Sequence, residues 1–164
     1  MLGRIYIIGE PILRKKTKLV QKVTQAERQL FDEMLTLMRK AEGVGLAANQ
    51  AGIDMQMCVI CIGDKTLKLA NPEILQKKGI AVFEEGCLSL PGITVKVKRA
   101  KEITCRALNE DNELITFDAS QLLARAVQHE IDHLSGKMII DYASPWQKLT
   151  LKEKIKALKN KQNG

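Results

Sequence analysis

Both histidines of the chain lie in one short segment, His129-Glu130-Ile131-Asp132-His133, which has the pattern H-E-x-x-H. Residues four apart lie on one face of a helix, so the two imidazoles can bind one metal ion. Glu130 lies between them and can act as a base toward water at that metal. The pattern therefore predicts a metal-dependent hydrolase. The alternative, a helix with two surface histidines, is disfavoured because the 164-residue chain has no other histidine.

A catalytic metal site of this kind needs a third protein ligand and an open position. A third histidine is excluded, and the position that a longer three-histidine motif would use is Ile139. Cys87 is the preferred candidate because its segment, E-G-C-L-S, ends an expected strand, where functional residues often lie. Glu153 and Asp141 remain alternatives. A thiolate with two imidazoles suits iron, zinc, nickel or cobalt.

A third segment, Gly43–Gln50, reads G-V-G-L-A-A-N-Q. It matches a dinucleotide-binding loop in letters, but such a loop follows a strand and this one follows an expected helix. Glycines allow the backbone to approach a ligand closely, and Gln50 adds an amide donor. The segment therefore indicates a ligand-binding loop, with a simple helix cap and turn as the alternative.

The rest of the chain predicts the elements that position these motifs. Thr24 and Glu27 form a capping box, and the apolar spacing after them predicts a helix to about Glu42. Strands are expected at 55–62, 67–71, 80–88, 93–98, 102–108 and 113–118, with a turn at 109–112 between the last two.

A second helix is expected to carry H-E-x-x-H as far as Leu134, capped by Asp118 or Ser120. After one short strand, Ser144-Pro145 begins a third helix. The predicted fold class is α+β, with mixed or antiparallel sheets around a central H-E-x-x-H helix, an N-terminal helix and a C-terminal helix.

Length and composition predict one domain over residues 1–164, because the chain is 45% hydrophobic and 27% charged. No apolar run approaches the roughly 20 residues of a membrane span. Glu10-Pro11 follow a short apolar stretch where a signal peptide would have its cleavage site. We therefore expect a cytoplasmic protein without a membrane segment.

Cys58 and Cys61 form a C-x-x-C pattern, which can indicate zinc or redox chemistry. The residues around them form an unbroken apolar, β-branched run typical of a buried strand. Positions three apart on a strand point to opposite faces. We therefore predict two core thiols in a reduced compartment rather than a metal or disulfide site.

The net charge of +7 is concentrated at the C-terminus. Residues 147–164 contain six lysines and one glutamate, a net charge of +5, so the rest of the chain is nearly neutral. Such a segment is either a solvated helix face or a dock for a polyanion such as RNA. Aromatic residues make up only 4% of the chain, which disfavours recognition by base stacking.

Taken together, three segments resemble the signature motifs of peptide deformylases. These motifs are G-x-G-L-A-A-x-Q at 43–50, E-G-C-L-S at 85–89 and Q-H-E-x-D-H at 128–133. All signature positions match in order, and the length and basic final helix are also similar to bacterial members. The resemblance implies a hydrolase that removes the N-formyl group from nascent polypeptides beginning with formylmethionine and releases formate.

The resemblance also implies a role for each matching residue. The implied metal is typically Fe(II), with zinc, nickel or cobalt also able to occupy the site, and its ligands are Cys87, His129 and His133. Glu130 is the implied general acid and base, and the Gln50 amide and Leu88 backbone N–H stabilise the oxyanion. The basic helix at 147–164 is implied to dock near the ribosomal exit tunnel.

The predicted substrate-binding residues are Val44, Gly45, Gly86, Leu122, Arg125 and Ala126. Leu122 and Ala126 lie near the His129 face of the helix and leave room for an unbranched methionine side chain. Arg125 is expected to line this pocket with its stem and to hold its charge near the mouth. The alternative is that these are ordinary core residues.

Two further expectations concern Thr94 and a network of charged residues. Thr94 departs from some bacterial members, which have an arginine three residues after the proline of the second motif. Glu85, Arg99 and Asp132 are expected to form a charged network that orients the metal ligands.

Two other functions compete with this interpretation. Another H-E-x-x-H metallopeptidase could cut internal peptide bonds, but it needs a long cleft that is harder to build in 164 residues. A basic ribosome- or RNA-binding protein with a degenerate site belongs to a different class. It is disfavoured because the three ligands and Glu130 are all intact.

Overall fold

The computed structural model describes residues 1–162. The described helices are α1 (Gln25–Lys40), α2 (Gln121–Leu134) and α3 (Pro145–Gln162), with 3-10 turns at Pro11–Arg14, Ala48–Ala51 and Ile139–Tyr142. The described strands are β1 (Gly45–Ala47), β2 (Met57–Ile62), β3 (Lys65–Lys78), β4 (Ala81–Cys87), β5 (Leu90–Arg99), β6 (Glu102–Leu108) and β7 (Leu114–Ser120).

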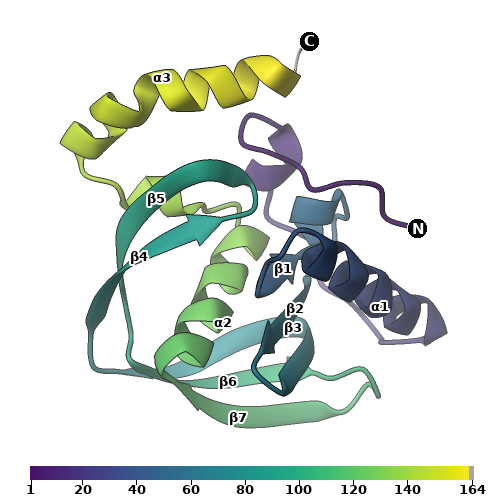
Figure 1. Cartoon of the computed structure of the whole chain (residues 1–164). Coiled ribbons are helices and arrows are strands. Elements are labelled where there is room, and N and C mark those ends of the chain that lie inside the picture. The colour runs from purple at the N-terminus through teal and green to yellow at the C-terminus, as the bar shows by residue number, and fades with distance from the viewer. Residues whose placement is uncertain (163–164) are drawn as a thin grey trace.

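The strands form two antiparallel sheets, one of five strands in the order β1-β2-β3-β6-β7 and one of two strands, β4-β5. Figure 1 shows α2 between the β4-β5 ribbon and the larger sheet, with α1 and α3 on the outside. The predicted α+β class is confirmed. The expectation of a single domain over 1–164 stays a prediction, and its last two residues lie outside the described part of the chain.

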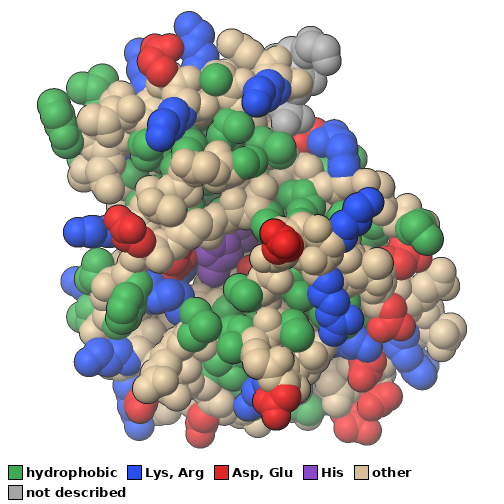
Figure 2. Space-filling view, viewed as in Figure 1, with side chains coloured by type: hydrophobic (Ala, Val, Ile, Leu, Met, Phe, Trp, Pro, Cys, Tyr) green, Lys and Arg blue, Asp and Glu red, His purple; other side chains and the backbone are tan. Residues whose placement is uncertain are grey.

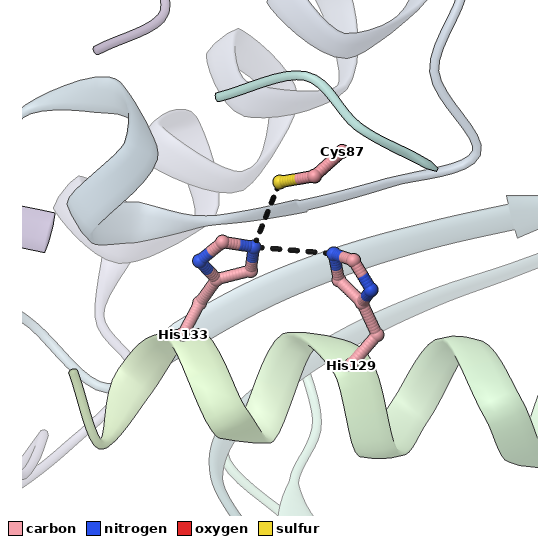
Figure 3. Close-up of side chains that lie close together, drawn as sticks. All are labelled: Cys87, His129 and His133. Carbon is pink, nitrogen blue, oxygen red and sulfur yellow. Dashed lines mark hydrogen bonds between the residues drawn. The ribbon is translucent and has the colours of Figure 1, made fainter. Parts of the chain in front are cut away.

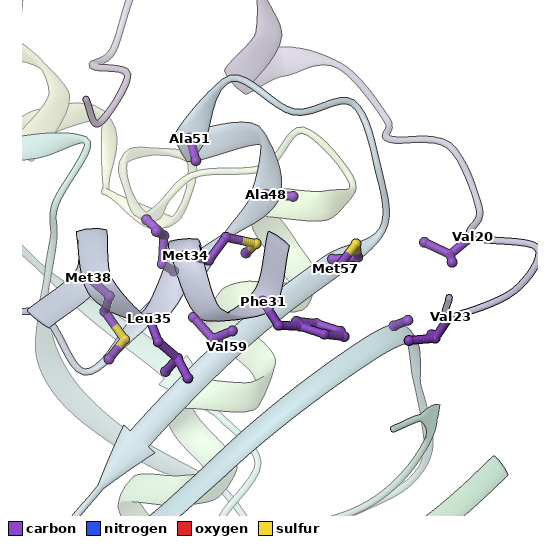
Figure 4. Packing of buried hydrophobic residues seen from close by; sticks show 12 residues of the cluster. Val20, Val23, Phe31, Met34, Leu35, Met38, Ala48, Ala51, Met57 and Val59 are labelled. Atoms are coloured by element: carbon purple, nitrogen blue, oxygen red, sulfur yellow. The ribbon is translucent and has the colours of Figure 1, made fainter. Parts of the chain in front are cut away.

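Helix α1 forms as its sequence predicts. Thr24 accepts a hydrogen bond from the Ala26 N–H, and Glu27 accepts one from the Thr24 N–H, which satisfies exposed donors at the helix start. Its apolar face is buried against β2 (Figure 4), through Phe31, Met34, Leu35 and Met38. This packing fixes the position of the chain that enters the glycine-rich segment.

Strand β2 carries the C-x-x-C pattern, and its two thiols lie on different faces. Cys58 is fully buried, whereas Cys61 is partly exposed and accepts a hydrogen bond from the Thr66 hydroxyl at 3.5 Å. Both cysteines are free. The prediction that these thiols do not converge is confirmed, whereas the prediction that both are core residues holds only for Cys58.

Helix α2 begins without the expected cap. Ser120 is the N-cap residue, but its side chain makes no capping hydrogen bond. Asp118 instead accepts a hydrogen bond from the Thr104 hydroxyl at 2.6 Å across the β6-β7 pair. Small residues such as Ala124 let the helix pack closely on the sheet. The helix ends before Gly136, whose φ of +80° and proximity to Arg14 leave no room for a side chain.

Several element bounds differ from the sequence prediction by one to three residues, and two larger differences, in β3 and after α2, arise where tertiary contacts override the local pattern. The strand expected to end at residue 71 continues to Lys78, because Asn71 takes a φ of +52° at a register shift between β3 and β6. The Asn71 side chain bonds both backbone groups of Val20 and so supports the irregularity. The short strand expected after α2 is wrong: residues 139–142 form a 3-10 turn held by Asp141, which accepts from the Met138 N–H at 3.0 Å.

Helix α3 begins as predicted, with Pro145 in its first turn and the Ser144 hydroxyl accepting a hydrogen bond from the Gln147 N–H at 3.1 Å. Leu151, Ile155 and Leu158 pack against the core beside β5. Figure 2 shows basic side chains on the outer surface of this helix. Across residues 1–162, the helices are too short or too polar to span a bilayer.

Candidate active site

The three predicted metal ligands come from two elements and point toward one another (Figure 3). Cys87 ends β4, and His129 and His133 lie one turn apart on α2. The Nε2 atom of His133 is 3.2 Å from Cys87 Sγ and 3.1 Å from His129 Nε2. All three donor atoms lie within 4.8 Å of one another. The fold therefore forms a compact set of one sulfur and two nitrogen donors.

The two alternative third ligands have other roles. The Asp141 carboxylate accepts a hydrogen bond from Arg14 at 2.7 Å and forms an ion pair with it. Glu153 is exposed on α3, among lysines. Neither belongs to the cluster formed by Cys87 and the two histidines.

Glu85 organises the charges behind this cluster. Its Oε1 atom lies 2.9 Å from His129 Nδ1, which leaves Nε2 of that ring facing Cys87 and His133. Arg99 donates to both oxygens of Glu85, at 2.8 and 2.9 Å, and to Asp132 at 2.7 Å. The expected network of Glu85, Arg99 and Asp132 is confirmed. A carboxylate on the far nitrogen of a ligand histidine fixes the orientation of the ring.

The two histidines of the cluster have pKa values that are shifted in opposite directions. Burial by itself lowers the pKa of His129, but hydrogen bonds to Cys87 and Glu85 raise it to about 10. Burial and the charge on His129 hold the pKa of His133 well below its ordinary value. Burial raises the pKa of Glu85, but its bonds to His129 and Arg99 lower it to about 2. Positive charge is thus stabilised on His129, between Cys87 and Glu85, and disfavoured on His133. One sulfur and two imidazole nitrogen donors fit a divalent transition metal ion.

Glu130 is a buried carboxyl group beside the cluster. Only 4% of the residue is exposed, and burial raises its pKa to about 7. Its Oε2 atom has no hydrogen-bond partner within residues 1–162. Its Oε1 atom lies against Gly45, where a Cβ would come within 2.5 Å of it. A buried acid with a pKa near neutrality and an unpartnered oxygen can exchange a proton with a ligand.

The Gln50 side chain is held in the site by three contacts. Its Oε1 accepts from the Ala47 N–H at 2.9 Å, and its Nε2 donates to Ser89 Oγ at 3.1 Å. The same Nε2 lies 3.6 Å from Cys87 Sγ. The amide is therefore fixed next to the thiol. Leu88, which follows Cys87, packs its side chain against Gly43.

All six predicted substrate residues line one pocket of about 400 Å³ that also reaches His129 and Glu130. The six predicted residues in this lining are Val44, Gly45, Gly86, Leu122, Arg125 and Ala126. Figure 2 shows histidine at the floor of a hollow in the surface. Thr94 is exposed and pairs with Gly86 across the β4-β5 ribbon.

Arg125 differs from its prediction. Only 11% of its side chain is exposed, and its Nη1 donates to Glu85 at 2.5 Å and to the Val97 carbonyl at 2.9 Å. Its Nη2 donates to the Ala81 carbonyl at 2.8 Å. The expectation that its charge lies near the pocket mouth is wrong, because a buried carboxylate and two strand carbonyls draw the guanidinium inward.

Sequence reasoning missed two supporting residues. Ser89 is fully buried and links Gln50 to the Tyr6 carbonyl, to which it donates at 2.7 Å. Tyr142 donates to Asp132 at 2.6 Å and so extends the charged network. Ser89 belongs to the E-G-C-L-S motif and could have been found there, whereas the position of Tyr142 depends on the turn after α2.

The fold and this site define a metal-dependent hydrolase of the H-E-x-x-H type. Residues 2–149 match the family described as polypeptide deformylase. A peptide deformylase of Clostridium botulinum is 48% identical over 140 residues, covering 85% of this chain and 95% of that protein. One of Hamiltonella defensa is 44% identical over 149 residues, covering 89% and 87%. The crystal structure of the Thermotoga maritima peptide deformylase has a TM-score of 0.85 and 39% identity, covering 88% and 99%.

The chain belongs to the polypeptide deformylase family. It is an enzyme that removes the N-formyl group from N-formylmethionyl nascent peptides, and the family is metal-dependent. Neither an internal-bond peptidase nor an RNA-binding protein with a degenerate site is favoured.

Proposed function

We propose that the chain hydrolyses the formyl amide of formylmethionyl peptides with a metal held by Cys87, His129 and His133. The observation that carries this proposal is the convergence of these three donors next to a pocket that Cys87, His129 and Glu130 line, where Glu130 has an unpartnered oxygen. We propose Fe(II) as the ion, with zinc, nickel or cobalt as substitutes that suit the same donors. A divalent ion there supplies Lewis acidity that polarises the formyl carbonyl and acidifies water.

Glu130 moves the protons of the reaction. Its carboxylate takes a proton from the water that attacks the formyl carbon, and it then delivers that proton to the leaving amine as the C–N bond breaks. The products are formate and a free methionyl amine. The pKa of about 7 suits both steps, because the group is easily deprotonated and reprotonated near neutral pH.

Gln50 and the Leu88 backbone N–H stabilise the negative charge that develops on the formyl oxygen. Hydrogen bonds to Ala47 and Ser89 fix the Gln50 amide before substrate binds, so little reorganisation is needed. A preorganised donor of this kind contributes about 10²–10³-fold in rate.

The methionine side chain enters the pocket lined by Val44, Leu122 and Ala126. Gly45 and Gly86 bring backbone close to the peptide, because neither has a side chain to obstruct it. The formyl group is small enough to reach Cys87 and Glu130 at the floor of this pocket. An acetyl group carries an additional methyl group that the narrow site must accommodate.

A pair of peptides tests the proposal. With metal-loaded protein, we expect rapid hydrolysis of formyl-Met-Ala-Ser and at least a hundredfold lower kcat/KM for acetyl-Met-Ala-Ser. Metal analysis of anaerobically purified protein should give about one iron per chain. Equal hydrolysis of the acetyl peptide, or cleavage at an internal bond, would overturn the proposal.

We further propose that the enzyme works in the cytoplasm, at the ribosomal exit tunnel, through the exposed lysines of α3. Six lysines of this helix are exposed, while Leu151, Ile155 and Leu158 pack on the core. Attraction to ribosomal RNA by phosphate contacts is sensitive to salt. Deleting 148–164 would also remove core packing, so substitution of lysines is the cleaner test.

A further inference from the structure

Asn49 is a fully buried polar residue that contacts His133, one of the three proposed metal ligands. It belongs to the 3-10 turn Ala48–Ala51 and directly precedes Gln50. Its Nδ2 atom donates a hydrogen bond to the His133 carbonyl at 2.5 Å. The same carbonyl accepts from the Gly136 N–H at 3.0 Å, so Asn49 takes part in the cap at the end of α2. One side chain therefore connects the turn that carries the Gln50 amide to a residue that carries a metal donor.

The two histidines differ in what holds their second ring nitrogen. Nδ1 of His129 lies 2.9 Å from Glu85 Oε1. Nδ1 of His133 is buried and has no hydrogen-bond partner within residues 1–162. Figure 3 shows this nitrogen turned away from Cys87 and His129. A histidine that binds a metal through Nε2 keeps its proton on Nδ1 and almost always donates it to an oxygen. With its metal bound, His133 therefore requires an acceptor at Nδ1.

Asn49 has an acceptor of the kind that His133 requires. Across residues 1–162, four buried side-chain N and O atoms have no hydrogen-bond partner, and two of them are Asn49 Oδ1 and His133 Nδ1. Of the others, one belongs to Glu130, which lines the substrate pocket, and one to Asp54, whose other oxygen pairs with Lys15. Oδ1 and Nδ2 of Asn49 share one carbon atom, so Oδ1 lies close to the residue that Nδ2 contacts. An amide oxygen and a ring N–H are complementary, and each alone is costly to bury.

We propose that Asn49 is a positioning residue that holds His133 as a metal ligand. Its Oδ1 accepts the His133 Nδ1–H, directly or through one buried water, while its Nδ2 keeps the His133 carbonyl in place. This inference rests on the proposed function, because it assigns His133 Nε2 to the metal. Glu85 of β4 orients one ligand histidine, and Asn49 of the 3-10 turn orients the other. The turn also carries Gln50, so one rigid unit sets the distance between the proposed oxyanion donor and the metal.

Zinc affinity of the full-length protein gives the first test. Zinc has a filled d shell, so it is neither redox-active nor paramagnetic. Asn49→Leu has a side chain of similar size that neither donates nor accepts a hydrogen bond. The zinc dissociation constant of this variant, measured by competition with a chelator, should therefore rise about 10- to 100-fold.

Asn71→Gly is the matched control for this test. The Asn71 side chain also bonds backbone groups of a distant residue, both those of Val20, but it does not line the substrate pocket. Glycine tolerates the φ of +52° at this position, so the change removes the hydrogen bonds without adding backbone strain. Zinc affinity of the control should stay within threefold of wild type.

The NMR signals of the histidine rings give the second test. The chain has only two histidines, so zinc-loaded protein with isotope-labelled histidine should show two Nδ1–H signals. In Asn49→Leu the His133 signal should move upfield because its acceptor is lost, while the His129 signal, held by Glu85, should not move. Asn49→Asp keeps an oxygen acceptor, so its His133 signal should stay at the wild-type position or move downfield. A general structural loss would not move one signal alone.

The outcomes separate this inference from the proposed function. Wild-type protein that does not bind one zinc ion per chain would overturn the proposed function. Zinc affinity of Asn49→Leu within threefold of wild type, or an unmoved His133 signal in that variant, would overturn the inference alone. An equal loss of affinity in Asn71→Gly would also overturn it, because general loosening would then explain the effect. Where Asn49→Leu does not fold, Asn49→Asp decides, and an upfield His133 signal in that variant overturns the inference.

Discussion

The charges around Glu85 and those on α3 are used in opposite ways. Glu85 is 7% exposed and bonds two arginines and a histidine within 2.9 Å. The lysines of α3 are exposed to solvent. A buried network depends on each member, because a lone buried charge is costly, whereas exposed charges act as a sum that salt weakens. Charged residues of this chain therefore position a site in one region and provide an electrostatic field in the other.

Substitution of Glu130 should have the largest effect on activity. Glu130→Gln keeps the shape of the buried side chain but cannot exchange the proton, so kcat should fall by about 10²–10⁴-fold. Metal content should stay near that of wild type, because the three proposed ligands remain. Steady-state kinetics and metal analysis on one preparation check this. Retained turnover would show that another group moves the proton.

Loss of Glu85 should have the largest effect on stability. Glu85→Ala leaves Arg99 and Arg125 without their shared carboxylate, and removing one member of such a network costs about 3–5 kcal/mol. Urea unfolding measures the loss. Glu153→Ala on α3 is the matched control and should change stability by less than about 0.5 kcal/mol. A similar loss of unfolding free energy at both positions would contradict the contrast between the buried network and the exposed helix.

The pair of Asp141 and Arg14 should show an intermediate, pH-dependent effect. Burial raises the pKa of Asp141, but its bonds to Arg14 and the Met138 N–H outweigh burial and hold it below its ordinary value of 3.8. Its stabilisation is therefore complete above that pH and is lost as pH falls through the lower folded pKa.

Asp141→Asn should lower stability at pH 6 by about 0.2–1 kcal/mol, the range of a partly exposed pair. The difference from wild type should shrink at pH 3. Urea unfolding of both proteins at the two pH values is the measurement. A difference that grows as the pH falls would contradict the assigned direction of the pKa.

The lysines of α3 should have the smallest effects on the isolated enzyme. Lys152→Ser with Lys156→Ser should change stability by about 0.5 kcal/mol or less and leave hydrolysis of short formyl peptides within twofold of wild type. Ribosome binding should weaken, and its dependence on salt should become shallower. Binding that is unchanged and insensitive to salt would remove α3 from the proposed docking surface.

Local patterns were sufficient for the parts of the site that lie on one helix or one motif. The spacing of His129 and His133 places both on one face of α2 because the period of a helix is fixed. The segment around Cys87 identified the third donor only through its motif, because nothing local shows that the end of β4 meets α2. The predicted side-chain cap of α2 and the short strand predicted after α2 were wrong, since a cross-strand bond of Asp118 and a long-range bond of Asp141 decide these segments.

The residue types and their motifs were enough to predict the chemistry, since the two histidines, Cys87 and Glu130 are groups that can bind a metal or move a proton. Tertiary structure alone decided the direction in which Arg125 points. A long side chain has many rotamers, and the choice among them depends on partners that lie far away in the chain. Glu85, Val97 and Ala81 meet Arg125 only because the β4-β5 ribbon folds over α2. The same folding buries Glu85 and Arg99 together and pairs them with Arg125, Asp132 and His129 behind the site.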